Sequence, residues 1–148
     1  MVRRRYVGNE AEKGIAAMAL PVTALYAGLM GLWLLVLAFA VMRERRRNDV
    51  SVGDAGVPAL QRAIRAHGNA VEYVPVALIL LGLAEGMGMP GWLLHLAGLA
   101  LTAGRLLHGW YFLTGAARLN VRVAGMMLTV AVIALLSLGL VFHALAQF

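Results

Sequence analysis

The chain has 148 residues, of which 61% are hydrophobic, and its mean hydropathy is +0.79. A soluble domain is nearer half apolar, so this composition excludes an ordinary water-soluble protein and predicts a single integral membrane domain over residues 1–148. The chain has no cysteine, which excludes disulfides, thiolate metal sites and a cysteine nucleophile, and its formal net charge is +6.

Apolar runs predict four transmembrane helices, since a run of about 18 or more such residues can cross a bilayer. The predicted helices cover residues 15–42, 58–85, 91–113 and 121–145, and Pro58 fits a first helical turn. The first run follows an arginine-rich start, but it is about twice as long as the apolar core of a signal peptide, so we expect it to be retained. The predicted fold is therefore all-α, an integral membrane four-helix bundle embedded in the lipid bilayer.

The distribution of arginines predicts the orientation. Basic residues are enriched on the cytoplasmic side of membrane proteins, which places the connectors 43–57 and 114–120 in the cytoplasm despite the opposing basic N-terminus. This arrangement accounts for the net charge, and no basic face with interleaved aromatics suggests a nucleic-acid partner. The eight arginines in and beside the connectors are Arg43, Arg45, Arg46, Arg47, Arg62, Arg65, Arg118 and Arg122.

A polar stripe runs along the start of the second predicted helix. At about 100° per residue, Arg62, Arg65, Asn69 and Glu72 fall within about 80° of one another, whereas His67 lies on nearly the opposite side. Ionisable side chains in a membrane segment usually face the bundle interior and mark a site. We therefore expect this stripe to belong to a binding site, and His67 to make a helix or subunit contact.

Three further polar residues lie near the same predicted end of the bundle, namely Arg105, His108 and Arg122. Together with the stripe they give a surplus of arginine, whose planar fork binds carboxylates, so an anionic ligand is expected. The alternative for Glu72 is an internal ion pair with Arg65 or Arg105 that only fixes helix packing, and His108 is equally well explained as a packed structural histidine. No histidine spacing suggests a metal site.

The polar residues of the second, third and fourth predicted helices form a pattern that resembles a known protein family. The pattern R-x-x-R-A-H-x-N-x-x-E-Y-x-P at residues 62–75, followed by G-R-L-L-H at 104–108 and an arginine at the start of the fourth helix, resembles the MAPEG family, and most closely its bacterial branch. These are membrane-associated proteins of eicosanoid and glutathione metabolism. The resemblance implies a homotrimer in which glutathione binds at three sites between subunits, and a location in the bacterial inner membrane.

The resemblance also implies roles for individual residues. Arg122 would stabilise the glutathione thiolate and is the predicted catalytic residue, since a fixed positive charge lowers the pKa of a nearby thiol. Arg105 and His108 would complete the pocket from the third helix. The residues expected to hold the carboxylates and amine of glutathione are Arg65, Asn69, Glu72 and Tyr73, with Arg62 beside them in the stripe.

Some positions depart from the family pattern. Phe112 stands where the eukaryotic enzymes often have tyrosine, while Gly68 and Val123 stand where the prostaglandin synthase has arginine and serine. These departures argue against prostaglandin isomerase chemistry. The predicted function is a glutathione-dependent membrane enzyme that conjugates glutathione to, or reduces, lipophilic electrophiles entering from the bilayer. The alternative is a non-catalytic lipid-binding or scaffold protein; a small transporter is a third interpretation, disfavoured by the uncharged cores of the first and fourth helices.

Overall fold

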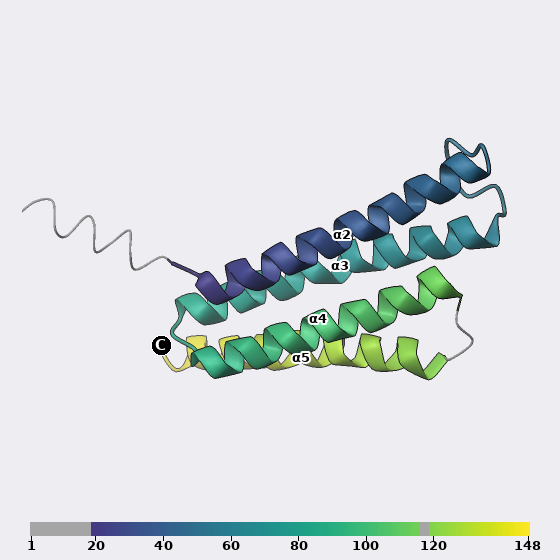
Figure 1. Ribbon diagram of the computed structural model, residues 1–148. Helices are drawn as coiled ribbons and strands as arrows, with labels where there is room; N and C mark the ends of the chain where they lie inside the picture. The colour runs from purple at the N-terminus through teal and green to yellow at the C-terminus, as the bar shows by residue number, and fades with distance from the viewer. Residues whose placement is uncertain (1–18, 116–118) are drawn as a thin grey trace, which may run out of the picture.

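The computed structural model describes residues 19–115 and 119–148 and has four long helices (Figure 1). They are α2 (Pro21–Arg47), α3 (Pro58–Gly86), α4 (Gly91–Thr114) and α5 (Leu119–Leu145). Successive helices run in opposite directions, so the described start of the chain and its C-terminus lie at one end of the bundle. The 48–57 connector and the α4–α5 junction lie at the other, which we call the connector end. The predicted all-α bundle is confirmed.

The helices pack as a four-membered bundle in which α3 and α4 are central. The helix pairs in contact are α2 with α3, α4 with α5, α3 with α4, α2 with α4, and α3 with α5. Over the described residues α2 and α5 do not contact each other. Helices α3 and α4 each contact the three other helices. The residues of the candidate site therefore lie mainly on these two central helices.

The predicted boundaries of the first helix need correction. The predicted start at residue 15 lies outside the described residues, but residues 19 and 20 are not helical and α2 begins at Pro21. The helix ends at Arg47, five residues beyond the predicted end at 42, because three arginines in its last turn favour the negative end of the helix dipole. The arginines at 43–47 therefore belong to the helix rather than to the connector. The other helices end within two residues of their predicted limits.

Small side chains line the inner face of α3. They recur every three or four residues, which allows the neighbouring backbones to approach closely without a large side chain between them. Larger apolar residues, including Val74 and Leu81, complete this buried row. The buried alanines of this face are Ala63, Ala66, Ala70, Ala77 and Ala84.

Large apolar side chains are exposed along all four described helices, as a lipid-facing surface requires. Three of the described helices, α2, α3 and α5, are long and apolar enough to cross a membrane. Helix α4 contains His95, Arg105 and His108, which lower its hydropathy, yet Arg105 and His108 are buried inside the bundle. Polar groups in a membrane helix are tolerated when they face such an interior. The protein is therefore a multi-pass integral membrane protein.

At the end of the bundle that holds the C-terminus, a carboxylate of α3 accepts hydrogen bonds from the first turn of α2. Glu85, at the end of α3, accepts hydrogen bonds from the backbone N–H of Val22 at 2.9 Å and of Thr23 at 2.7 Å. The first N–H groups of a helix have no partner within it, and no side chain of the preceding residue, Leu20, caps α2. Glu85 therefore joins two helices by accepting from N–H groups that have no partner within α2.

Helices α2 and α4 meet through aromatic residues that pack on glycine. The Tyr26 ring lies so close to Gly98 that a Cβ there would overlap it, and its hydroxyl donates to the His95 carbonyl at 3.1 Å. The same hydroxyl lies 3.1 Å from Nδ1 of His95. In the same way, the Trp33 ring packs against Gly109. These contacts fix the rotation of α4, and so determine which of its polar residues face inward.

Candidate functional site

Arg105 lies at the centre of the candidate site and is only 2% exposed. Its Nη1 donates to Oδ1 of Asn69 on α3 at 2.9 Å, and its Nη2 donates to the Gly125 carbonyl on α5 at 3.5 Å. The guanidinium also lies 3.7 Å from the Met126 sulfur and over the Tyr73 ring, 5.7 Å from its centroid. Its Nε is buried without a hydrogen-bond partner. Arg105 therefore links α3, α4 and α5 through neutral acceptors, with no carboxylate bonded to it among the described residues.

This link depends on a close crossing of α4 and α5. A Cβ added to Gly125 would lie 2.6 Å from the Gly104 carbonyl oxygen and 2.8 Å from the His108 backbone nitrogen, and one added to Gly104 would lie 2.8 Å from the Gly125 carbonyl oxygen. The Gly125 carbonyl also accepts a hydrogen bond from Thr129 Oγ1 at 3.1 Å. Only glycine permits this approach, which brings the Gly125 carbonyl within reach of Arg105.

Little in the sequence indicates this crossing. Glycine inside a helix destabilises it by about 1 kcal/mol relative to alanine, so glycines at positions 104 and 125 suggest that close packing compensates for this cost. The sequence does not show that these two glycines contact each other. The spacing of Gly82 and Gly86 fits a close-packing motif better. In the structure a Cβ on either of these two would make only ordinary contacts near the start of α2, at 3.5 and 3.9 Å. The tightest helix approach therefore depends on residues from different helices.

Arg122, at the start of α5, lies against two aromatic rings of α4. Its guanidinium carbon is 5.3 Å from the centroid of Phe112 and 5.9 Å from that of Tyr111. The Phe112 ring in turn packs 5.2 Å from the His108 ring. A cation within about 6 Å of an aromatic centroid is attracted to the ring face. Arg122 is exposed, and the two rings restrain the position of its guanidinium.

His108 is the point at which the cations of three helices converge. Its side chain is 5% exposed. It lies within electrostatic range of Arg65 on α3, Arg105 on its own helix and Arg122 on α5. The structure thus brings together six of the predicted site residues, and the resulting region is strongly positive. These six are Arg65, Asn69, Tyr73, Arg105, His108 and Arg122.

The polar stripe of α3 does not face the bundle interior as predicted. Arg62, Arg65 and Glu72 are exposed in the single chain and Asn69 is half-buried, because alanines occupy the inward-facing positions between them. Neither of the ion pairs considered as the alternative for Glu72 forms. Within the described part of the chain Arg62, Arg65 and Arg122 also have no carboxylate partner. The stripe therefore flanks the Arg105 link and remains free to meet a ligand or a neighbouring subunit.

Glu44 was not predicted as a site residue, but it lies beside the stripe. This carboxylate is only 9% exposed, and Oε1 accepts hydrogen bonds from Arg43 Nε and Arg47 Nη1, each at 3.2 Å. It also lines a cavity of about 30 Å³ together with Arg62 and Phe112. Nothing in the local sequence separates Glu44 from the other acids near the connector, since its burial depends on the packing of α2 against α3 and α4.

Two further observations bound the site. Over the described residues no group of three or more histidine or acidic side chains is arranged to hold a metal ion. Arg118, which the orientation argument counted among the connector arginines, lies outside the described residues, as do the basic residues of the N-terminus. The orientation of the bundle in the membrane stays a prediction.

Comparison with known proteins gives one family and two curated relatives. The profile described as the MAPEG family matches residues 23–142, which include every predicted site residue. The chain is 47% identical over 91 residues to the inner membrane protein YecN of Escherichia coli strain K12, an alignment that covers 62% of this chain and 70% of that protein. The YecN protein of E. coli O6:H1 matches with the same identity and coverage.

Proposed function

The chain belongs to the MAPEG family, and we propose that it is a glutathione-dependent enzyme of the bacterial inner membrane that conjugates glutathione to, or reduces, lipophilic electrophiles. Family membership makes it a membrane protein of the glutathione and eicosanoid metabolism group. The name of the E. coli relatives supports the inner-membrane location. The finer statement, glutathione chemistry, rests on the residues of the site.

The observation that carries the proposal is the restrained, unpaired Arg122 beside a cluster of cations. Its guanidinium is oriented by the Tyr111 and Phe112 rings and has no carboxylate partner among the described residues. A fixed positive charge favours a thiolate over a thiol, and a charge held in place before reaction stabilises it without reorganisation. In this proposal Arg122 stabilises the glutathione thiolate, the species that attacks the electrophile.

The other exposed polar groups match the charges of glutathione. Glutathione carries two carboxylates and one ammonium group, and Arg62 and Arg65 offer guanidinium forks while Glu72 offers a carboxylate. Arginine forks suit carboxylates because two parallel N–H groups fit two oxygens. All three side chains are exposed at one face of α3 in the single chain, so a neighbouring subunit would close the pocket in the proposed homotrimer.

We assign Arg105 and Asn69 a positioning role within this proposal. Arg105 is 2% exposed and its fork is already occupied by Asn69 and the Gly125 carbonyl. It thereby holds the first turns of α5, which carry Arg122, against α3. Direct ligand binding by Arg105, as the family resemblance implies, would require its buried guanidinium to become accessible, whereas Asn69 accepts through Oδ1 and keeps its Nδ2 donors for a ligand.

Replacement of Arg122 by leucine tests the proposal. We expect Arg122→Leu to reduce conjugation of glutathione with 1-chloro-2,4-dinitrobenzene by at least about 100-fold, the usual order for loss of one charge-stabilising group. Glutathione should still stabilise the variant in a thermal-shift assay, because the residues that hold its carboxylates remain. Native mass spectrometry should show the same oligomer as the wild type. Unchanged turnover would refute the thiolate role.

A second candidate is a lipid-binding or scaffold protein without glutathione chemistry. The observation that favours it is an apolar cavity of about 350 Å³ between α4 and α5, lined by leucine, alanine and similar side chains. It begins about one turn beyond the Gly104–Gly125 crossing, which separates it from Arg122. Calorimetry of the detergent-solubilised protein distinguishes the two: no heat and no thermal stabilisation with millimolar glutathione supports the scaffold.

A further inference from the structure

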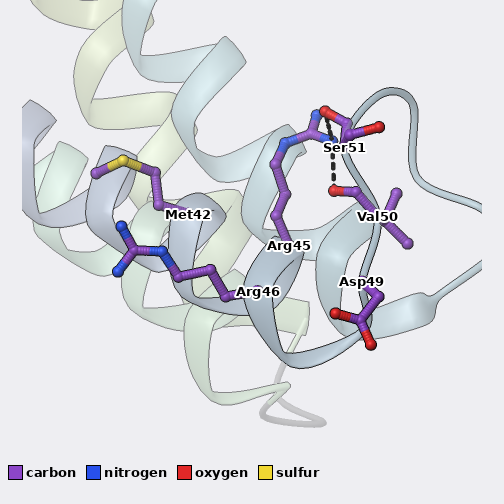
Figure 2. Close-up of a pocket in the computed structure, with 6 residues that line it drawn as sticks. All are labelled: Met42, Arg45, Arg46, Asp49, Val50 and Ser51. Carbon is purple, nitrogen blue, oxygen red and sulfur yellow. Dashed lines mark hydrogen bonds between the residues drawn. The ribbon is translucent and has the colours of Figure 1, made fainter.

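An open depression lies at the end of α2, and none of the residues lining it belongs to the candidate glutathione site. Its volume is about 440 Å³, and it is formed where the connector folds back over the last turn of the helix (Figure 2). The residues lining it are Met42, Arg45, Arg46, Asp49, Val50 and Ser51. It combines one long apolar side chain, two guanidinium groups and exposed loop backbone.

The cavity is shaped by Arg45, which fixes the connector. Its Nη1 donates to the carbonyl of Val50 at 3.4 Å and to that of Ser51 at 3.1 Å. Asp49 has a φ of 52°, a left-handed conformation that turns the chain back toward the helix. The loop wall is therefore held by hydrogen bonds to the helix, and Arg45 has little capacity left for a ligand at that nitrogen.

Arg46 is the unengaged cation of this helix end. Arg43 and Arg47 both pair with Glu44, and Arg45 is bonded to the connector. Arg46 has no hydrogen bond or ion pair within the described part of the chain, and Figure 2 shows its guanidinium extending alongside Met42, well apart from the Asp49 carboxylate. Compensation of the helix dipole explains why arginines gather here, but does not explain why one of them lines a cavity unpaired.

The position of the cavity indicates the kind of ligand. It lies at the end of a helix long and apolar enough to cross a membrane, and the end of such a span meets the polar headgroup region of a bilayer. Met42 is 41% exposed and lies on the side of the apolar span, whereas Arg46 lies one turn beyond it. Basic residues just outside a membrane span attract anionic lipids. A ligand with an anionic phosphate and an apolar tail meets both groups.

We propose that this cavity binds the phosphodiester headgroup of an anionic glycerophospholipid, with Arg46 contacting the phosphate and Met42 contacting the start of the acyl chains. The lining shares no residue with the proposed glutathione site, so the proposal does not depend on the proposed activity. It would fix the depth and orientation of α2 and hold the short connector against the membrane surface.

The experiment compares two variants that change the net charge equally. The full chain in nanodiscs of phosphatidylcholine is titrated with phosphatidylglycerol, and bound lipid is counted by native mass spectrometry. We expect Arg46→Gln to weaken phosphatidylglycerol binding about fivefold. We expect Arg47→Gln, whose arginine is paired with Glu44, to change it less than twofold. Arg46 is exposed and unpaired, so its replacement should leave folding intact, which the helical circular dichroism signal checks.

The outcomes separate this site from simpler explanations. Equal weakening by both variants would show a diffuse positive surface and overturn the proposal. An absence of preference for phosphatidylglycerol over phosphatidylcholine would also overturn it. A third arm adds inorganic phosphate and glycerol phosphate: displacement of the lipid by either at millimolar concentration would show a general anion site and would overturn the assignment of a phospholipid.

Discussion

The crossing of α4 and α5 at Gly104 and Gly125 makes a sharp prediction about Gly125→Ala. The new Cβ would lie 2.6 Å from the Gly104 carbonyl oxygen, and ordinary contact begins at 3.4 Å. The two backbones must therefore separate by about 0.8 Å, because the atoms in conflict belong to helix backbones rather than to flexible side chains. Overpacking of this kind typically costs about 1–3 kcal/mol.

The same shift reaches the candidate site. The hydrogen bond from Arg105 to the Gly125 carbonyl is already long at 3.5 Å, so a further separation removes it. Arg122 lies three residues before Gly125 on α5 and would move away from the aromatic rings that restrain it. We therefore expect Gly125→Ala to lower both the stability of the bundle and the glutathione-dependent turnover.

A matched control lies on the same helix. A Cβ added to Gly139 would meet no heavy atom within 4 Å, so Gly139→Ala has the same chemistry without the clash, and alanine favours the helix by up to about 1 kcal/mol. In thermal unfolding of the detergent-solubilised proteins, Gly125→Ala should melt lower than the wild type by on the order of 3–10 °C. Gly139→Ala should melt at the wild-type temperature or above. If the two variants melt together, the crossing is not tight and the argument fails.

Three other predictions address the rest of the fold. Glu85→Gln removes the charge that accepts two backbone N–H groups at the start of α2, so we expect a loss of about 1–2 kcal/mol in thermal unfolding; an unchanged melting temperature would contradict the capping role. Asn69→Ala leaves Arg105 buried without its 2.9 Å acceptor and should lower the free energy of unfolding by about 1–3 kcal/mol. A melting temperature equal to that of the wild type would contradict this expectation. The chain has no cysteine, so single cysteines at Ser51 and Ala146 report orientation: a membrane-impermeant maleimide added to intact cells should label Ala146→Cys but not Ser51→Cys, and the reverse pattern would invert the proposed topology.

The sequence by itself determined the class of protein and the four helices of the described residues, and it predicted the polar groups of the candidate site. Hydropathy and helical periodicity are properties of neighbouring residues, since transfer into lipid acts on each residue and the helix repeats every 3.6. These local rules located three of the four helices to within two residues at each end. They failed at the arginine-rich end of α2, where helix-dipole compensation extended the helix into residues predicted to be connector.

Partners between helices were decided only by the tertiary structure. The sequence suggested Glu72 as a partner for Arg105, because opposite charges attract, but Arg105 bonds to Asn69 and a backbone carbonyl while Glu72 is exposed. Helical phase placed the stripe on one face, yet a row of alanines determined which face turns inward. Which residues contact each other depends on how closely two helix backbones approach. At the α4–α5 crossing, that distance is set by Gly104 and Gly125 together. These residues lie on different helices, so a pattern of neighbouring residues cannot predict the contact.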